Sequence, residues 1–185
     1  MTVQWQEQRA DAVAQRILDV AEDLYAAHGV DAVTMRALAA KAGCSRATLY
    51  RYFASREAVQ AAFVDRSAAR IARAVARGVT ATEPAEQLVS GIRCALALVR
   101  DNPAFANWFR ADGVATAAQL AVVSPVVESL ARGFVAELGE SATTSADERA
   151  RWLVRVMLSL LSSPGSSPDE ESRMLHSFVV PVIVG

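Results

Sequence analysis

Apolar residues recur at helical spacing along most of the chain. In residues 10–30, ADAVAQRILDVAEDLYAAHGV, they lie three or four positions apart, and the acidic residues fall largely elsewhere. This period of about 3.6 residues predicts a helix with one buried face, and Gly29 supplies a left-handed stop at its end. Because the same period returns in the later segments, the pattern predicts an all-α protein.

Residues 34–53 predict two short helices joined by a tight turn. Thr34 is placed to cap the first helix, Gly43 breaks it, and Ser45 is placed to cap the second. Ala39 and Ala42 are short enough to let the helices cross closely. This is the pattern of a helix-turn-helix, whose second helix enters the major groove of DNA when the motif binds DNA.

The second of these helices, SRATLYRYF, divides into two faces. Leu49, Tyr52 and Phe53 share one side, which we expect to be buried. The opposite arc holds Arg46, Ala47, Tyr50 and Arg51. Arg46 and Tyr50 can donate hydrogen bonds to base edges or phosphates, and Ala47 leaves room for close approach. Two of the three aromatic residues therefore belong to the core, and Tyr50 does not.

The charge distribution also favours contact with DNA. Net charge is −1, but residues 34–56 hold five cations and no acidic residue. Thr34, Thr48 and Arg56 border the same surface, and their side chains suit phosphate oxygens. The alternative is an ordinary solvated surface, with Arg36 a surface cation and Tyr50 packed on its own helix. The acid-free stretch favours DNA contact. Its cations are Arg36, Lys41, Arg46, Arg51 and Arg56.

The segment TMRALAAKAGCSRATLYRYFASREAV resembles the N-terminal signature of TetR/AcrR-type transcriptional regulators. The resemblance covers roughly residues 10–64; beyond them it extends only to length, helical content and order of elements. It implies that the start of the fourth helix contacts phosphate, where this chain has Arg56 and the family usually has lysine. It also implies that the operator is faced by Thr34, Arg36, Ser45, Arg46, Thr48 and Tyr50.

The remainder of the chain predicts a second helical module. One helix over residues 55–78 links the two parts, and the TEP break at 82–84 begins the second. Asn102-Pro103 and Ser124-Pro125 are helix-start signals, so residues 113–138 form two helical pieces. We expect about nine helices in total. The predicted divisions are a DNA-binding domain (1–54), a connecting helix (55–78), and a ligand-binding and dimerisation domain (79–185).

The last two helices are predicted to form a dimer. DERARWLVRVMLSLL, residues 147–161, is apolar on two sides and therefore needs two partners. The family resemblance implies pairing through the last two long helices, whereas the alternative is burial of both in a monomeric bundle. Pro181 is expected to end or kink the final helix. The predicted contact residues are Trp152, Leu153, Val156, Leu160, Met174, Leu175, Phe178 and Val179.

Large apolar side chains in the second module allow two interpretations. Aromatic and methionine residues at helical spacing usually fill a core. The family resemblance instead implies a pocket for a small apolar or aromatic effector, and mostly apolar walls with a few polar groups suit such a site. The candidate lining residues are Cys94, Phe105, Trp108, Phe109, Phe134, Met157 and His176.

Other functions find little support in the sequence. Two histidines and two isolated cysteines show no nucleophile or metal-ligand spacing, so no catalytic activity, metal ion or cofactor is expected. No apolar run approaches the length of a membrane span and the first residues lack a secretory pattern, which predicts a cytoplasmic protein. The function expected is a DNA-binding regulator, a repressor released from a palindromic operator by a small apolar ligand. The rival is a dimeric helical interaction module whose helix-turn-helix is only a scaffold.

Overall fold

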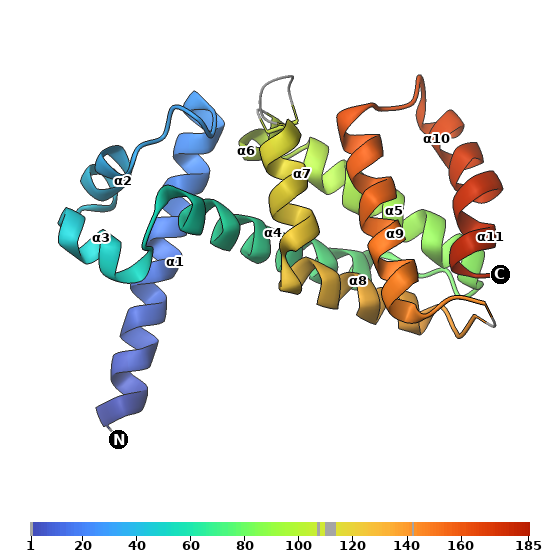
Figure 1. Ribbon diagram of the computed structural model, residues 1–185, viewed down its shortest axis with the longest axis horizontal. Helices are drawn as coiled ribbons and strands as arrows, with labels where there is room; N and C mark the ends of the chain where they lie inside the picture. Colours follow the sequence, from blue (N-terminus) through green and yellow to red (C-terminus); the bar gives the residue numbers. More distant parts are fainter. Residues whose placement is uncertain (1, 107, 110–113, 142) are drawn as a thin grey trace.

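In the computed structural model, which describes residues 2–106, 108–109, 114–141 and 143–185, every regular element is a helix. Figure 1 shows a small group of helices at the left, which we call the head, joined by one long helix to a larger group at the right, which we call the body. The head and the connecting helix comprise α1 (Thr2–His28), α2 (Met35–Ala42), α3 (Arg46–Tyr52) and α4 (Arg56–Gly78).

The body begins after the predicted break and ends in a continuous helical rod. Its helices are α5 (Pro84–Arg100), α6 (Pro103–Ala106), α7 (Val114–Val123), α8 (Pro125–Glu137) and α9 (Ala146–Ser162). The rod that follows consists of α10 (Pro168–Met174), the π-helix η1 (Leu175–Val179) and α11 (Val180–Ile183).

The predicted all-α class is confirmed, with differences in some of the elements. The start signals at Thr34, Ser45 and Ser124 each accept a hydrogen bond from the first turn of their helix, and residues 114–137 are indeed two helices. In contrast, α1 begins well before Ala10, and α6 ends at Ala106. Beyond α6, residues 107 and 110–113 lie outside the described residues.

The turn between α2 and α3 depends on a glycine. Gly43 has φ +67° and ψ +33°, the left-handed conformation that L side chains rarely adopt, and its N–H closes the end of α2. A Cβ added there would have no neighbour closer than Arg16 Nη2 at 3.9 Å. The cost of a side chain at this position therefore comes from the backbone rather than from a clash.

We expect Gly43→Ala to lower the free energy of unfolding by about 1 to 2 kcal/mol, measured by urea titration. The matched control is Gly133→Ala, because Gly133 lies within α8 without positive φ and a Cβ there meets nothing within 4 Å. That change should raise the free energy of unfolding by about 0.5 to 1 kcal/mol. Equal effects from both substitutions would show that the turn does not require glycine.

The first apolar core joins the head to the start of the body. Tyr25 of α1 and Phe63 of α4 lie with ring centroids 5.3 Å apart, edge to face. Trp108 lies 5.8 Å from Tyr25 and 5.7 Å from Phe63, and Phe105 lies 5.1 Å from Phe63. Burial of these four rings fixes α6 and the turn after it directly against α1 and α4.

The second apolar core lies within the body, and a partly buried ion pair ties its edge together. It is built from α5, α8, α9 and the rod. Arg100, at the end of α5, donates two hydrogen bonds to the Glu171 carboxylate, at 2.9 and 2.7 Å, and one to the Leu160 carbonyl. These hydrogen bonds hold the pKa of Glu171 below its usual value. The pair fixes the position of the rod relative to α9.

Candidate nucleic-acid interface

The two caps of the head give α2 and α3 defined first turns. Thr34 Oγ1 accepts a hydrogen bond from the Ala37 N–H at 3.2 Å. Ser45 Oγ accepts one from the Thr48 N–H at 3.0 Å and lies 2.9 Å from Thr48 Oγ1. These hydroxyl groups therefore stabilise the helix ends in the free protein, while both residues remain on the exposed surface.

The faces of α3 divide as the sequence predicts. Leu49 is fully buried and Phe53 nearly so, whereas the Tyr50 side chain is 43% exposed. Arg46, Ala47 and Arg51 are exposed with Tyr50, and Tyr52 is half-buried. Because Leu49 and Phe53 anchor α3 on the first core, its outer face is held rigidly toward solvent.

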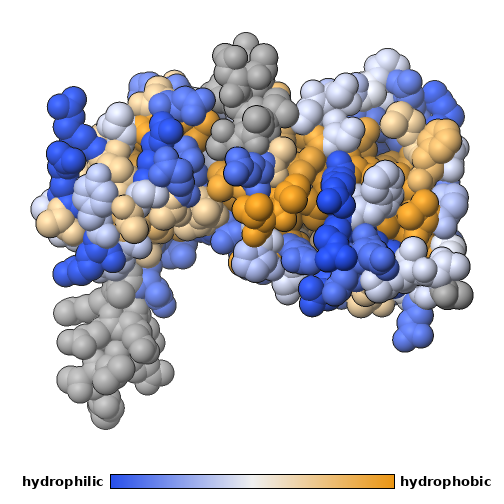
Figure 2. All heavy atoms as spheres, in the orientation of Figure 1, coloured by the Kyte–Doolittle hydropathy of each residue, from blue (hydrophilic) through white to orange (hydrophobic). Residues whose placement is uncertain are grey.

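The central cations of the head carry no ion pair within the part of the chain that the structure describes. These are Arg36, Arg46 and Arg51; the Arg51 guanidinium carbon lies 5.3 Å from the Tyr52 ring centroid. Lys41, in contrast, lies 3.9 Å from the Asp23 carboxylate. Figure 2 shows hydrophilic side chains at this end of the head, interspersed with weakly apolar ones. The uncompensated positive charge is thus concentrated on the exposed side of α2 and α3.

Arg56 has partners that the sequence did not reveal. Its Nη1 donates to the Asp31 carbonyl at 3.1 Å, and its Nε lies 3.6 Å from the Glu57 carboxylate. The pKa of Glu57 is lowered, chiefly by hydrogen bonds from its own N–H and from Ser55. Arg56 therefore ties the loop after α1 to the start of α4, in addition to any contact it makes with phosphate.

A second surface feature is an apolar groove between α9 and the rod. Its volume is about 370 Å³. Phe178 is 70% exposed beside it, and Trp152 and Met174 are also exposed. In η1 the Val180 N–H reaches the Leu175 carbonyl, five residues back, close to Pro181, which lacks an N–H. The groove is lined by Trp152, Arg155, Val156, Ser159, Leu160, Met174, Leu175, Phe178 and Val179.

The predicted dimer residues separate into surface and core. Leu160, Leu175 and Val179 are buried but form the floor of the groove, whereas Leu153 faces the second core and does not line the groove. The side of α9 that carries Leu153 thus packs inside the body. Arg155 and Ser159 were not predicted, although they share the helical spacing of Trp152 and Val156.

The seven candidate ligand residues are spread over both apolar cores, α5 and the outer surface of the body. Phe105, Trp108 and Phe109 belong to the first core, at the junction of head and body. Phe134 and Met157 pack against the second core, and Cys94 is half-buried on α5. His176 lies on the surface with Nε2 3.1 Å from Glu86. The helical period predicted apolar faces but not which helix covers each face.

The environment of His176 is electrostatic rather than apolar. Its Nδ1 lies 2.9 Å from the Ser172 carbonyl, and this hydrogen bond, followed by the one to Glu86, raises the pKa of the imidazole. The contact joins the rod to the start of α5. Because His176 lies on the outside of the body, its contact with Glu86 is best explained as a structural contact at the surface.

Two kinds of feature are absent from the described residues. No helix there combines the length and the apolar character that a membrane span requires. No three His, Cys, Asp or Glu side chains in that part of the chain are grouped so as to hold a metal ion.

Comparison with known proteins gives concordant findings. The family model described as bacterial regulatory proteins, tetR family, matches residues 17–63. Over 176 residues the chain is 42% identical to an HTH-type transcriptional regulator of Mycobacterium tuberculosis, covering 95% of this chain and 87% of that protein. The matched segment of the family model contains α2, α3 and the start of α4.

Solved structures show the same fold at low sequence identity. The TetR family repressor AlkX from Dietzia sp. is 22% identical with a TM-score of 0.69, covering 92% of this chain and 94% of that one. RolR in complex with resorcinol is 18% identical with a TM-score of 0.74, covering 96% and 90%. The repressor QsdR of R. erythropolis is 19% identical with a TM-score of 0.69, covering 94% and 95%.

Proposed function

Since the chain belongs to the TetR family of DNA-binding transcriptional regulators, we propose that it is a repressor and that two copies read a palindromic operator. The observation that carries this proposal is the outer face of α3. Arg46 and Tyr50 lie one turn apart there, and neither has a hydrogen-bond partner among the described residues. Both side chains are thus free to bind groups outside the protein.

We assign the residues of this face by what each can reach. With α3 in the major groove, Arg46 at its start meets base edges, and Tyr50 meets a base edge or a phosphate. Ala47, between them, permits close approach. Phosphate contacts position the head without reading sequence. For that role the candidates are Thr34, Arg36, Ser45, Thr48, Arg51 and Arg56.

The groove between α9 and the rod is the proposed dimer contact. Its exposed residues Trp152, Met174 and Phe178 form a continuous apolar surface with buried neighbours below them. Figure 2 shows apolar surface beside the rod at the far end of the molecule from the head. A two-fold axis at this face would place the same residues of both copies in contact and present two heads to one duplex.

Repression and its release are proposed by analogy with proteins of the same fold. AlkX and QsdR are repressors, and RolR has been solved with resorcinol. We propose that a small apolar or aromatic effector binds in the body. The Phe134 ring lies where a Cβ on Gly91 would be, at 2.5 Å from Cζ, so movement of this ring would open apolar space between α5 and α8. The effector must favour the DNA-incompetent conformation to cause release.

A DNA-bound repressor works in the bacterial cytoplasm, which is where we place the protein.

The rival function, an interaction module with an unused helix-turn-helix, gives no reason for three unpaired cations on an acid-free face. Binding to fluorescently labelled duplex DNA over a range of salt concentrations separates the two. The DNA-binding function predicts tight binding at low salt that weakens steeply as salt rises. The rival predicts no binding at any salt concentration.

A further inference from the structure

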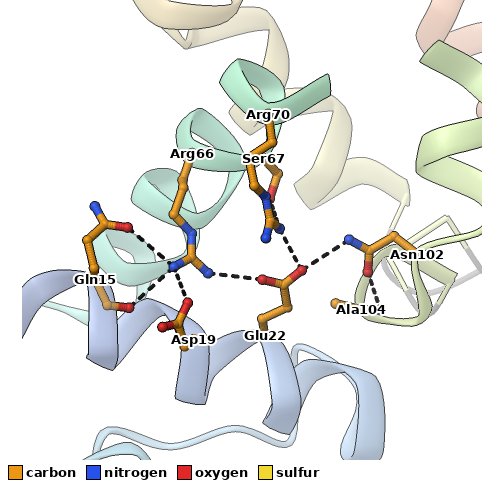
Figure 3. A network of polar contacts seen from close by, with 8 residues as sticks. All are labelled: Gln15, Asp19, Glu22, Arg66, Ser67, Arg70, Asn102 and Ala104. Atoms are coloured by element: carbon orange, nitrogen blue, oxygen red, sulfur yellow. Dashed lines mark hydrogen bonds and ion pairs between the residues drawn. The ribbon is translucent and has the colours of Figure 1, made fainter. Parts of the chain in front are cut away.

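The Glu22 carboxylate of α1 is shared by α4 and by the residue immediately before α6 (Figure 3). Arg66 Nη2 of α4 donates to Oε2 at 3.0 Å, and Arg70 Nη2 donates to Oε1 at 2.6 Å. Asn102, immediately before α6, donates from Nδ2 to the same Oε1 at 3.2 Å. Glu22 is only 23% exposed. One side chain of the head therefore contacts both the connecting helix and the start of α6.

The polar links of this network differ in strength. Two carboxylates of α1, Asp19 and Glu22, face two arginines of α4, so the charges between these helices balance. Arg66 Nη1 lies 2.6 Å from Asp19, and the Arg66 side chain is 12% exposed. The link to α6 is instead a single hydrogen bond from a neutral amide. Because its donor carries no charge, this bond is weaker than the ion pairs that Glu22 makes with Arg66 and Arg70.

The Asn102 side chain also makes a second hydrogen bond, to the backbone of α6. Its Oδ1 accepts a hydrogen bond from the Ala104 N–H at 2.9 Å, which caps the first turn of α6. Because Oδ1 and Nδ2 belong to one planar amide, the start of α6 and the Glu22 carboxylate are fixed relative to each other. The Phe105 and Trp108 rings that follow pack on Phe63 and Tyr25, so a displacement of α6 acts on α1 directly.

We infer that Asn102 and Glu22 are positioning residues that set the orientation of the head on the body by joining α6 to α1. This link bypasses α4: a change in the body that moves α6 changes the head even where the Arg66 and Arg70 ion pairs stay intact. Its effect on operator binding rests on the proposed function, whereas its effect on head orientation does not.

The test uses three variants with different chemistry at the same place. Asn102→Asp keeps the capping oxygen but replaces the donor with a negative charge that repels Glu22. Asn102→Ser keeps a helix cap but is too short to reach Glu22. The double variant Glu22→Gln/Asn102→Asp exchanges amide and carboxylate, so a donor and an acceptor face each other again. A fourth variant, Glu22→Gln, reports the effect of removing the charge that pairs with Arg66 and Arg70, and it completes a mutant cycle with Asn102→Asp and the double variant.

Head orientation is measured by pulsed electron paramagnetic resonance between spin labels on the head and the body. Labels at Ala40→Cys in α2 and Ala97→Cys in α5 occupy exposed positions. Cys44 and Cys94 are replaced by serine, and labelled protein is diluted with unlabelled protein to suppress signals between copies. Thermal unfolding of each variant is recorded in parallel.

The inference predicts a narrow distance distribution in the unsubstituted protein and the broadest one in Asn102→Asp. Asn102→Ser should lie between them, and the exchanged pair should recover the narrow distribution. Operator affinity of Asn102→Asp should fall about tenfold, equivalent to loss of one charge-assisted hydrogen bond, and recover in the exchanged pair.

An unchanged distribution in Asn102→Asp would overturn the inference, as would failure of the exchanged pair to recover while its thermal unfolding matches that of the unsubstituted protein. If the distributions follow the prediction in a protein that binds no DNA, the link stands and the proposed function fails.

Discussion

Phe178→Asp is expected to convert the dimer into monomers and to weaken binding to a full palindromic operator by about 100- to 10,000-fold. The loss follows because a monomer binds each half-site independently, without the effective concentration that the partner head provides. A carboxylate at this position would be buried without a partner in the apolar contact. Phe178 is 70% exposed in the single chain, so the substitution leaves the fold intact. Sedimentation measures the first effect, and fluorescence anisotropy measures the second.

Val123→Asp is the matched control for this experiment. Val123 is 68% exposed on α7 and does not line the groove between α9 and the rod. The Val123→Asp protein should remain a dimer with unchanged operator affinity. Val156→Asp, within the groove, should instead resemble Phe178→Asp. A dimer that survives both groove substitutions and dissociates on Val123→Asp would place the contact on α7.

Arg46→Ala is expected to lower operator affinity by about 1 to 3 kcal/mol per head and to relax the preference for one base pair in each half-site. The reason is that Arg46 is the exposed cation at the start of α3, the part of the helix that meets base edges. The measurement compares affinities for the operator and for variants substituted at each position.

Two other arginines test whether this effect is specific. Arg77→Ala removes the same charge from an exposed site at the far end of α4 and should leave operator affinity nearly unchanged. Arg56→Ala should weaken binding to every sequence and reduce its salt dependence. Because Arg56 also donates to the Asp31 carbonyl, this variant should lose stability as well. If Arg46→Ala weakens all sequences equally, Arg46 binds phosphate instead of a base.

The helix-turn-helix was predictable because its signals are local. Caps at Thr34 and Ser45 and the left-handed Gly43 each act within one turn of the chain. The outward direction of Tyr50 follows from the period of a single helix. The hydrogen bond from Arg56 to the Asp31 carbonyl was not predictable in this way, because the two residues lie 25 positions apart in the sequence.

The contacts between helices could not be read from periodicity. Phe105 and Trp108 were candidates for either the core of the body or a pocket in it, and they pack on Tyr25 and Phe63 of α1 and α4. The spacing shows that a face is apolar, but the covering helix is set by how the whole chain folds. For the same reason Leu153, on an apolar side of α9, could not be assigned to the core or to the dimer contact.

We expect the outer face of α3 to read DNA sequence as one of a symmetric pair. Selection of bound duplexes from a random DNA pool tests it most directly, because site, symmetry and spacing are obtained together. We expect enrichment of a palindrome whose half-sites are about 34 to 36 Å apart centre to centre, one helical turn or a multiple of it. Recovery of a pool without any enriched sequence, from protein shown to be folded and dimeric, would contradict the account.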